Sequence, residues 1–314
     1  MHYASCMRSL HRLMEETIDY AGLFPPAELP MRQTVQKYAA HRASPQRWIL
    51  ARIAIPVSRL HEFDREAVDL FPKTGSSSRD DAWRITAIMS SLHDHRVEED
   101  VEIIEKFNAA YERKGGTAAV IDAVETKALD GTTIAECMEM IPEGFETWVE
   151  IPWDKDPRGA ITALSGFDAG AKVRTGGTTI PAHPSPEQLA LFIDSTAAAS
   201  VPLKATAAIH HAARSLNSTV GCDQFGFLGV FIGACMRWHE RLNRQGLQEI
   251  LQERDPKAFL FSPDGVKWKT HQLSLREIDE ARRVFMKSFG SCSFEEPVDE
   301  LKSLGILPKE VATP

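Results

Sequence analysis

The sequence is poor in cysteine and lacks any long uninterrupted apolar stretch. Its five cysteines are scattered among 314 residues, and no two of them form a C-x-x-C pair. That pattern argues against a disulfide framework and against a structural zinc site, and it fits a reducing cytoplasm. The longest apolar run, 225–236, is too short and too rich in glycine to span a bilayer. The segment 1–20 is interrupted by charge and has no signal-peptide core, so we expect a cytoplasmic protein.

An excess of positive charge is also missing. The chain has 36 Lys and Arg against 44 Asp and Glu, which gives a net charge of −8. Such a chain is a poor candidate for sequence-independent binding of nucleic acid, and it has no basic run that suggests a membrane surface. No G-x-G-x-x-G or P-loop motif follows any predicted strand. This absence argues against a doubly wound open sheet, the second α/β architecture that we consider.

Short β-branched or apolar runs alternate with helical patterns along the chain. Eight segments are each predicted to contain a strand, and a helical pattern follows each of them. They are 18–26, 48–56, 83–91, 117–127, 145–152, 170–177, 201–211 and 288–294. Eight such units in about 300 residues are typical of a (β/α)8 TIM barrel of the α/β class. We expect one barrel domain over 1–314, with an insertion at 243–287 between strands seven and eight that holds a hairpin and a helix. The segment 73–84 is predicted to be a loop.

Polar residues interrupt the ends of these strands, where the catalytic side chains of barrel enzymes lie. They are Asp122, Glu125, Glu150, Lys172, Arg174, Lys204, Thr206, His210, His211, Ser291, Cys292 and Ser293. Because side chains alternate along a strand, Lys172 shares a face with Arg174, and Lys204 shares one with Thr206. Strands six and seven are neighbours, so we expect the two lysines to approach each other at the barrel mouth.

Two ammonium groups in a partly dry site disfavour each other's charge, so we expect one lysine to have a depressed pKa and to be a free amine. A free amine can attack a carbonyl group and form a Schiff base. In this hypothesis Lys172 is the nucleophile and Lys204 tunes its pKa. Proton transfer is assigned to Asp122 and Glu150. An anionic small-molecule substrate would be held by Arg174, Thr206, His210, His211, Ser291 and Ser293. No metal and no cofactor is expected.

The same residues support other interpretations. Lys172 and Glu150 are also consistent with a structural ion pair, and Cys292 with a small barrel residue rather than a nucleophile. A metal site of Glu150, Asp122 and one histidine is an alternative. So is a barrel lyase or isomerase that stabilises an enolate without a covalent step, with or without a metal. A catalytically idle barrel that serves as a binding or accessory protein is the third. The apolar stretch 227–236 is interpreted as core, with a contact in a homo-oligomer as the other interpretation.

Three short motifs resemble class I aldolases of the deoxyribose-phosphate-aldolase type. The segment 172–176, KVRTG, matches the K-x-x-T-G of that family's sixth strand, whose lysine forms the Schiff base. The segment 204–210, KATAAIH, is similar to K-A-x-G-G-I-R on the seventh strand. The segment 289–293, FGSCS, is similar to the F-G-x-S that precedes a phosphate-holding helix.

The resemblance implies a TIM barrel, a Schiff base on Lys172, a second active-site lysine at Lys204 and a catalytic aspartate at Asp122. The family's double glycine is replaced by the pair 207–208, which is Ala-Ala, and its arginine by His210. The resemblance therefore supports the fold and the lysine chemistry more than a phosphorylated sugar as substrate.

The chain also resembles, over nearly its whole length, an uncharacterised group of bacterial proteins. The shared segments are D-Y-A-G-L-F-P-P-A, K-x-R-T-G-G, K-A-T-A-G-x-H-H, H-G-F-L-N and G-S-C-S-F-x-E-P. Phe225 and Gly229 stand where that pattern has histidine and asparagine. If those two residues do chemistry in the group, this chain has altered or lost it, which is the reason for considering an idle barrel.

Overall fold

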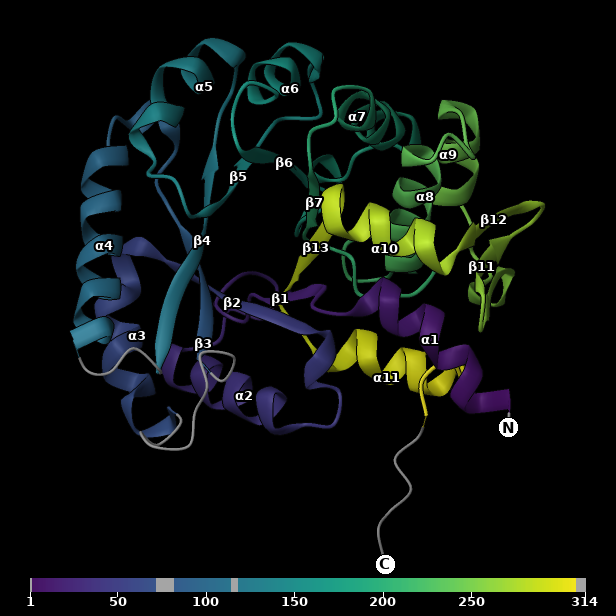
Figure 1. Cartoon of the computed structure of the whole chain (residues 1–314), viewed down its shortest axis with the longest axis horizontal. Helices are drawn as coiled ribbons and strands as arrows, with labels where there is room; N and C mark the ends of the chain where they lie inside the picture. Colours follow the sequence, from purple (N-terminus) through teal and green to yellow (C-terminus); the bar gives the residue numbers. More distant parts are fainter. Residues whose placement is uncertain (1, 72–81, 114–117, 309–314) are drawn as a thin grey trace, which may run out of the picture.

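The computed structural model describes residues 2–71, 82–113 and 118–308 (Figure 1). Within these ranges, eight parallel strands close into a barrel in the order β1-β13-β7-β6-β5-β4-β3-β2. They are β1 (Ile18–Tyr20), β2 (Leu50–Pro56), β3 (Trp83–Ile88), β4 (Ala119–Lys127), β5 (Glu146–Glu150), β6 (Ala169–Arg174), β7 (Leu203–Thr206) and β13 (Met286–Ser291). Each overlaps one predicted strand segment, so the predicted (β/α)8 TIM barrel is confirmed. The loop predicted over 73–84 lies largely outside the described residues.

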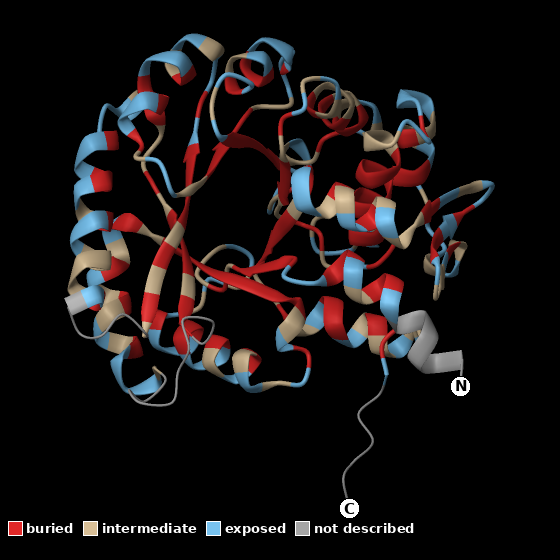
Figure 2. Ribbon diagram, viewed as in Figure 1, coloured by how far each residue is buried: buried red, intermediate tan, exposed pale blue. Residues whose placement is uncertain are grey.

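Helices surround the barrel, with their buried faces toward the strands and their exposed faces outward (Figure 2). Their bounds are α1 (His2–Met14), α2 (Met31–Ala43), α3 (Leu60–Ala67), α4 (Val97–Arg113), α5 (Gly131–Cys137), α6 (Arg158–Leu164), α7 (Pro186–Ala198), α8 (Phe227–Trp238), α9 (Arg244–Leu251), α10 (Leu275–Val284) and α11 (Glu295–Ser303). Helix α7 begins after Ser185, whose side chain caps the helix and forms a capping box with Gln188. Among the described helices, none has the length and hydropathy needed to cross a lipid bilayer.

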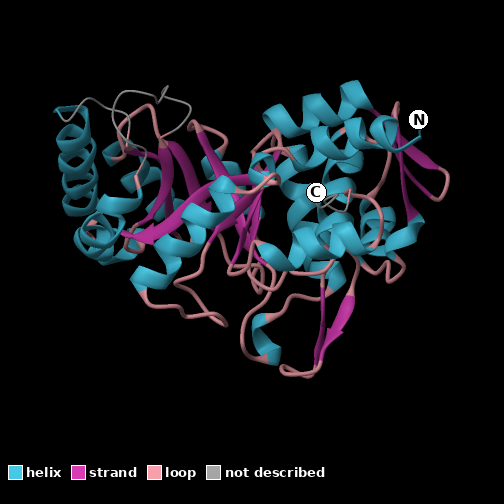
Figure 3. Ribbon diagram, turned by 90° about the horizontal axis from the view of Figure 1, so that it is seen from below, coloured by secondary structure: helices cyan, strands magenta, loops and turns pink. Residues whose placement is uncertain are grey.

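The predicted insertion at 243–287 contains α9, a three-stranded antiparallel sheet and α10. The sheet consists of β10 (Phe259–Ser262), β11 (Gly265–Trp268) and β12 (His271–Ser274). The first two strands form the hairpin that the Pro-Asp-Gly turn predicts, while β12 was not anticipated. Figure 3 shows this sheet beside the N-terminal helix. A second hairpin, β8 (Ser215–Asn217) with β9 (Cys222–Gln224), lies between β7 and α8 and was also not anticipated.

Helix α8 is buried over its residues 227–236, which confirms that this apolar stretch is core. Gly229 lets it pack closely against α9, because a Cβ there would lie 2.9 Å from the carbonyl oxygen of Ile250. Phe225 is buried just before the helix, under the guanidinium group of Arg214. Both departures from the bacterial group's pattern therefore serve packing around α8.

One extra residue in β4 changes which side chains face the barrel interior. Ile85 of β3 pairs with Ile121, but the next residue, Thr86, pairs with Ala123. Asp122 is the additional residue, and such a bulge resets the alternation of side chains along a strand. As a result, Asp122 reaches the arginines of β2 and β3, while Glu125, three residues later, reaches the lysines of β6 and β7.

The glycine that begins the stretch GAKVRTGG makes room for an indole ring. Gly170 is the neighbour of Trp148 across β5 and β6, and a Cβ on it would lie 2.2 Å from that ring. The ring is buried beneath the polar mouth of the barrel, with the Lys204 ammonium group 5.8 Å from its centroid. Gly170 therefore allows a large aromatic side chain to fill the barrel interior under the lysines.

This arrangement predicts that Gly170→Ala is destabilising. A methyl group pressed into a buried indole ring should lower the free energy of unfolding by about 2 kcal/mol, measured by urea denaturation. Gly159→Ala is the matched control, because a Cβ there meets nothing within 4 Å. The control should be neutral or up to about 1 kcal/mol more stable. Equal stabilities of the two variants would contradict the packing described for Trp148.

Candidate active site

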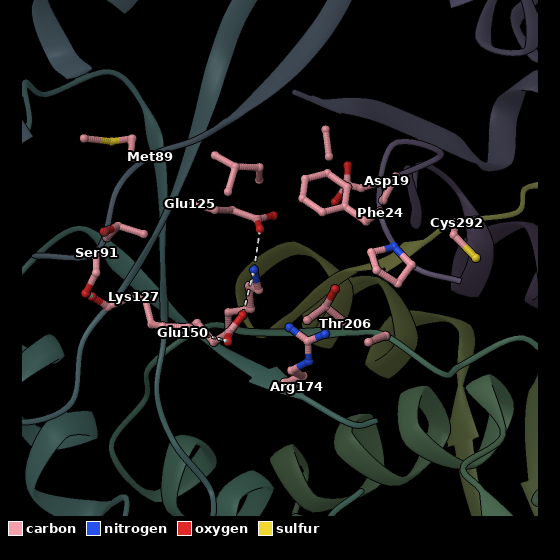
Figure 4. Close-up of a pocket in the computed structure, with 18 residues that line it drawn as sticks. Asp19, Phe24, Met89, Ser91, Glu125, Lys127, Glu150, Arg174, Thr206 and Cys292 are labelled. Carbon is pink, nitrogen blue, oxygen red and sulfur yellow. Dashed lines mark hydrogen bonds and ion pairs between the residues drawn. The ribbon is translucent and has the colours of Figure 1, made fainter. Parts of the chain in front are cut away.

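The carboxyl ends of the barrel strands enclose a cavity of about 460 Å³ (Figure 4). Its polar wall includes Glu125, Lys127, Glu150, Lys172, Arg174 and Thr206, with Asp19 and Ser91. Its apolar wall includes Phe24, Pro25, Ala54, Ile88, Met89 and Ala207, and Cys292 lies at its edge. Such a site at the C-terminal ends of the strands is where TIM-barrel enzymes carry their chemistry.

Glu125 lies between the two lysines. Its Oε2 atom is 2.6 Å from Lys172 Nζ, and its Oε1 atom forms an ion pair with Lys204 Nζ. Lys172 and Lys204 are direct neighbours across β6 and β7, so the expected approach of the two lysines is observed. The carboxylate between them removes most of the repulsion between the two ammonium groups.

Lys204 lies deeper in the barrel than Lys172. Its side chain is only 1% exposed, and its Nζ atom is 2.6 Å from Asp19 Oδ2. Asp19 also accepts hydrogen bonds from the Ser288 hydroxyl group, at 2.7 Å, and from the backbone N–H of Arg52, at 3.1 Å. Lys204 is thus fixed from two sides, and Lys172 is the lysine that faces the cavity.

Glu150 completes the surroundings of Lys172. Its Oε2 atom is 3.0 Å from Lys172 Nζ, and its Oε1 atom is 3.3 Å from Lys127 Nζ at the rim. The ion pair that the sequence suggested between Lys172 and Glu150 is therefore present. Lys172 nevertheless has two carboxylate neighbours and an opening to the cavity, so its charge is paired without being shut off from a ligand.

The expectation that one lysine has a depressed pKa and is a free amine is wrong. Burial lowers the pKa of Lys172, but the carboxylates of Glu125 and Glu150 outweigh burial, and the pKa is raised well above its ordinary value. For Lys204, burial likewise acts downward, and Asp19 with Glu125 raises the pKa overall. Three acidic groups around two lysines, rather than the lysines' mutual repulsion, decide the protonation state.

Arg174 and Thr206 lie beside each other at the ends of β6 and β7 and extend toward the cavity (Figure 4). The Arg174 Nε–H donates to the carbonyl oxygen of Gly176 at 3.0 Å, which leaves the terminal nitrogens of the guanidinium group for an anion. Gly176 permits close contact of the two loops, because a Cβ there would lie 2.3 Å from the Cβ of Ala208. A Cβ on Gly177 would likewise lie 2.9 Å from the Cβ of Ala182, so both glycines after the strand are in close contact with neighbouring loops.

The loop after β7 keeps a glycine-like backbone although it carries alanines. Ala207 has φ 66° and Ala208 has φ 57°, both in the left-handed region. This conformation costs about 1–2 kcal/mol for each L-residue. The Thr175 hydroxyl group donates to the Ala207 carbonyl oxygen at 2.5 Å and helps to hold the loop. The backbone expected of a double glycine is thus retained in the cavity wall.

Asp122, expected to transfer protons, lies away from this cavity. Its carboxylate is bound by Arg52 Nε at 2.7 Å and by Arg84 Nε at 2.7 Å, and Arg52 also reaches Glu146. Burial raises the pKa of Asp122, but the two arginines outweigh it and the pKa is lowered overall. The bulge at Asp122 directs this side chain to the opposite end of the barrel interior. Glu125, three residues later on the same strand, is the acidic residue of β4 that contacts the two lysines.

Four other predicted substrate contacts lie at the edge of the site or outside it. His210 pairs with Glu296 at 2.8 Å, and His211 pairs with Glu300 at 3.2 Å. The Ser291 hydroxyl group donates to the backbone carbonyl of Ser293, whose own hydroxyl group accepts from the N–H of Glu296. The two serines thus organise the start of α11. Of the predicted residues, the structure assembles Glu150, Lys172, Arg174 and Thr206 in the cavity wall, with Lys204 behind them.

Two acidic residues of the site were not assigned a role from the sequence. Asp19 stands in the middle of the short strand Ile18-Asp19-Tyr20, and an acidic residue inside a buried strand was the signal for it. Glu125 was recognised as a polar strand-end residue, but alternation along an unbulged strand does not place it with the lysines.

The alternative metal set is not assembled, since Asp122 and Glu150 have separate partners. Within the described ranges, no cluster of three or more His, Cys, Asp or Glu residues is arranged to hold a metal ion.

No protein-family model matches the chain, and a search of curated proteins returns no match. The function is therefore inferred from the geometry of the cavity and from the fold that presents it.

The burial of Lys204 predicts a large difference between the two lysine variants. Lys204→Met leaves Asp19 buried without its cation and should cost about 3–5 kcal/mol of unfolding free energy. Lys172→Met should cost clearly less, because Glu125 keeps Lys204 and Glu150 keeps Lys127. Chemical denaturation of both variants measures the difference. A greater loss for Lys172→Met would contradict this ranking.

Acid should destabilise the protein through Glu125. Burial raises the pKa of Glu125, but the two lysines outweigh burial and lower it from 4.5 to about 2. A carboxylate with a lower pKa in the folded state contributes stability above pH 4.5 and loses it as the pH falls toward 2.

The free energy of unfolding should therefore fall over this range, with Glu125 accounting for on the order of 3 kcal/mol. Urea unfolding at a series of pH values measures the dependence. Glu125→Gln should be less stable at pH 7 and should show a smaller loss on acidification. An unchanged acid dependence in that variant would refute the assignment.

Proposed function

We propose that the protein is a lyase of the aldolase type, which acts on a small anionic carbonyl compound through a Schiff base on Lys172. The observation that carries this proposal is the position of Lys172 Nζ, in the cavity wall between two carboxylates. Both Glu125 and Glu150 lie within proton-transfer distance of the amine. The partial resemblance of the segment 172–176 to class I aldolases agrees with this assignment.

The first chemical step transfers a proton from the Lys172 ammonium group to Glu125 Oε2 or Glu150 Oε2. The amine lone pair then attacks the carbonyl carbon, the C=O π pair moves to oxygen, and the second carboxylate carries a proton from the attacking nitrogen to that oxygen, which gives a neutral carbinolamine. The carboxyl group that took the first proton returns it to the leaving hydroxyl group, and loss of water gives the iminium ion. The iminium ion accepts the electron pair of the Cα–Cβ bond when that bond breaks, while a β-hydroxyl group of the substrate gives its proton to a carboxylate and becomes the carbonyl group of the leaving fragment.

The acidic surroundings of Lys172 suit the iminium ion as well as the ammonium group. Both species carry one positive charge at the same nitrogen, so the carboxylates that raise the pKa of Lys172 also stabilise the intermediate. The cost of forming the free amine is recovered when the iminium ion forms. Lys204 stays charged and holds Glu125 in place, which makes it a positioning residue in this mechanism.

Arg174 is the reason for proposing an anionic substrate. Its guanidinium group lies in the polar wall near Thr206, and it provides a fork that fits a carboxylate or a phosphate. Phe24, Pro25 and Met89 supply apolar surface for the remainder of a small molecule. The volume of about 460 Å³ suits a compound of metabolite size.

The first test is borohydride trapping with a panel of small aldehydes and keto acids, followed by peptide mass spectrometry. A reduced adduct is expected on Lys172, and Lys172→Met should lose it. Lys127 is the internal control, because it lines the same cavity and its side chain is 53% exposed. Adducts on Lys127 and surface lysines without one on Lys172 would argue against the Schiff base.

A second candidate function follows from the charge on Lys172. A lysine that remains an ammonium group can stabilise an enolate without a covalent step, as a barrel lyase or isomerase would require. Lys172→Arg separates the two mechanisms with any substrate that the panel identifies, because arginine keeps the cation and cannot form the Schiff base. Loss of turnover by about 10²-fold or more is expected for the covalent mechanism, and retained turnover would favour the second candidate.

A further inference from the structure

Cys292 follows β13 and lines the same cavity as Lys172, on the side of Phe24 and Asp19 (Figure 4). Its Sγ atom lies 3.8 Å from His210 Nε2, within the range of a hydrogen bond to sulfur. The other ring nitrogen of His210, Nδ1, lies 2.8 Å from Glu296 Oε2. The three side chains therefore form a chain of thiol, imidazole and carboxylate.

Three separate elements bring these residues together. Cys292 comes from the end of β13, His210 from the loop after β7, and Glu296 from the first turn of α11. The Ser293 hydroxyl group accepts from the backbone N–H of Glu296 at 3.2 Å, which fixes the start of that helix. The side chain of His210 is only 12% exposed, whereas that of Glu296 is 62% exposed, so Glu296 pairs with the imidazole from the solvent side.

The charged neighbours of this group favour a proton on His210. Burial lowers the pKa of His210, but its contacts with Cys292 and Glu296 outweigh burial and raise it to about 9. Other titratable groups face the cluster from the packed elements. Tyr20 on β1 and Glu295 on α11 interact electrostatically across it, His211 lies near Glu296, and Lys37 and His41 on α2 pair with Glu295.

We propose that Cys292, His210 and Glu296 form a second nucleophilic centre on the cavity, which takes a carbon electrophile of the carbonyl class. A nucleophile next to a base that is oriented by a third group is the arrangement that activates cysteine. This inference is independent of the Schiff base on Lys172, because it depends on different atoms.

The addition balances without an oxidant or a second reactant. Because His210 holds the proton of this pair on Nε2, the sulfur attacks as a thiolate, and its lone pair forms a bond to the carbonyl carbon. The C=O π pair moves to the oxygen, which takes the proton from His210 and gives a thiohemiacetal. Glu296 keeps its negative charge throughout and stabilises the imidazolium ion until that proton is transferred.

Iodoacetamide is a suitable probe, because the same sulfur lone pair displaces iodide from its carbon while His210 keeps its proton. The full chain is treated at pH 7, and the alkylation rate of each cysteine is followed by peptide mass spectrometry. Cys292 is expected to react at least about tenfold faster than Cys222. Both cysteines are partly exposed, so access alone does not explain such a difference.

Three variants identify the cause of the reactivity. His210→Gln should reduce the Cys292 rate to that of Cys222, and Glu296→Gln should reduce it partly while keeping the size of the side chain. His211→Gln is the matched control, since His211 pairs with Glu300 instead, and it should leave the rate within about twofold. Circular dichroism establishes that each variant is folded.

Equal rates at Cys292 and Cys222 in the unmodified chain would overturn the proposal. An equal loss in the His210 and His211 variants would also overturn it, because the effect would then not pass through the contact with Cys292. The readout is alkylation at a sulfur atom, so a negative result here leaves the borohydride test of Lys172 unaffected. A negative borohydride result likewise leaves this test unaffected.

Discussion

Glu125 holds two ammonium groups together beneath one small cavity, and the geometry of the site depends on this interaction. Two buried lysines side by side on neighbouring strands would repel each other and lose their hydration. The carboxylate between Lys172 and Lys204 offsets both the repulsion and the lost hydration. Asp19 forms a further ion pair with Lys204, and Glu150 forms one with Lys172. The site therefore keeps a cation at the end of Lys172 without needing water for it.

The barrel provides this arrangement through local departures from regular strands. The bulge at Asp122 brings Glu125 to the inner face, and it separates the acidic group of the lysine site from the arginine pairs at the other end. Gly170 gives space to the Trp148 ring, which fills the interior under Lys204. Irregular positions in this barrel thus shape the polar mouth. Regular alternation along β4 would not have brought Glu125 to the lysines.

The cavity brings two kinds of nucleophile within one small volume. Lys172 is surrounded by carboxylates and suits a step that passes through a cationic nitrogen, as in the aldolase-type reaction that we propose. Cys292 is paired with an imidazole that is oriented by Glu296, which suits addition to a carbonyl carbon. Arg174 lies in the same wall, so an anionic carbonyl compound is the ligand that suits both nucleophiles and the guanidinium group.

The sequence alone determined the barrel, because strand and helix periodicities are local properties of the chain and eight repeats leave few architectures. It also placed Lys172, Arg174, Lys204, Thr206 and Glu150 at strand ends, since side-chain alternation fixes their common face. The tertiary structure alone decided the partners of these residues. A bulge moved Glu125 to the lysines and Asp122 to the arginines, and carboxylates from distant strands raised the lysine pKa values that repulsion was expected to lower. Such effects depend on register and on contacts between residues far apart in the chain, which periodicity does not encode.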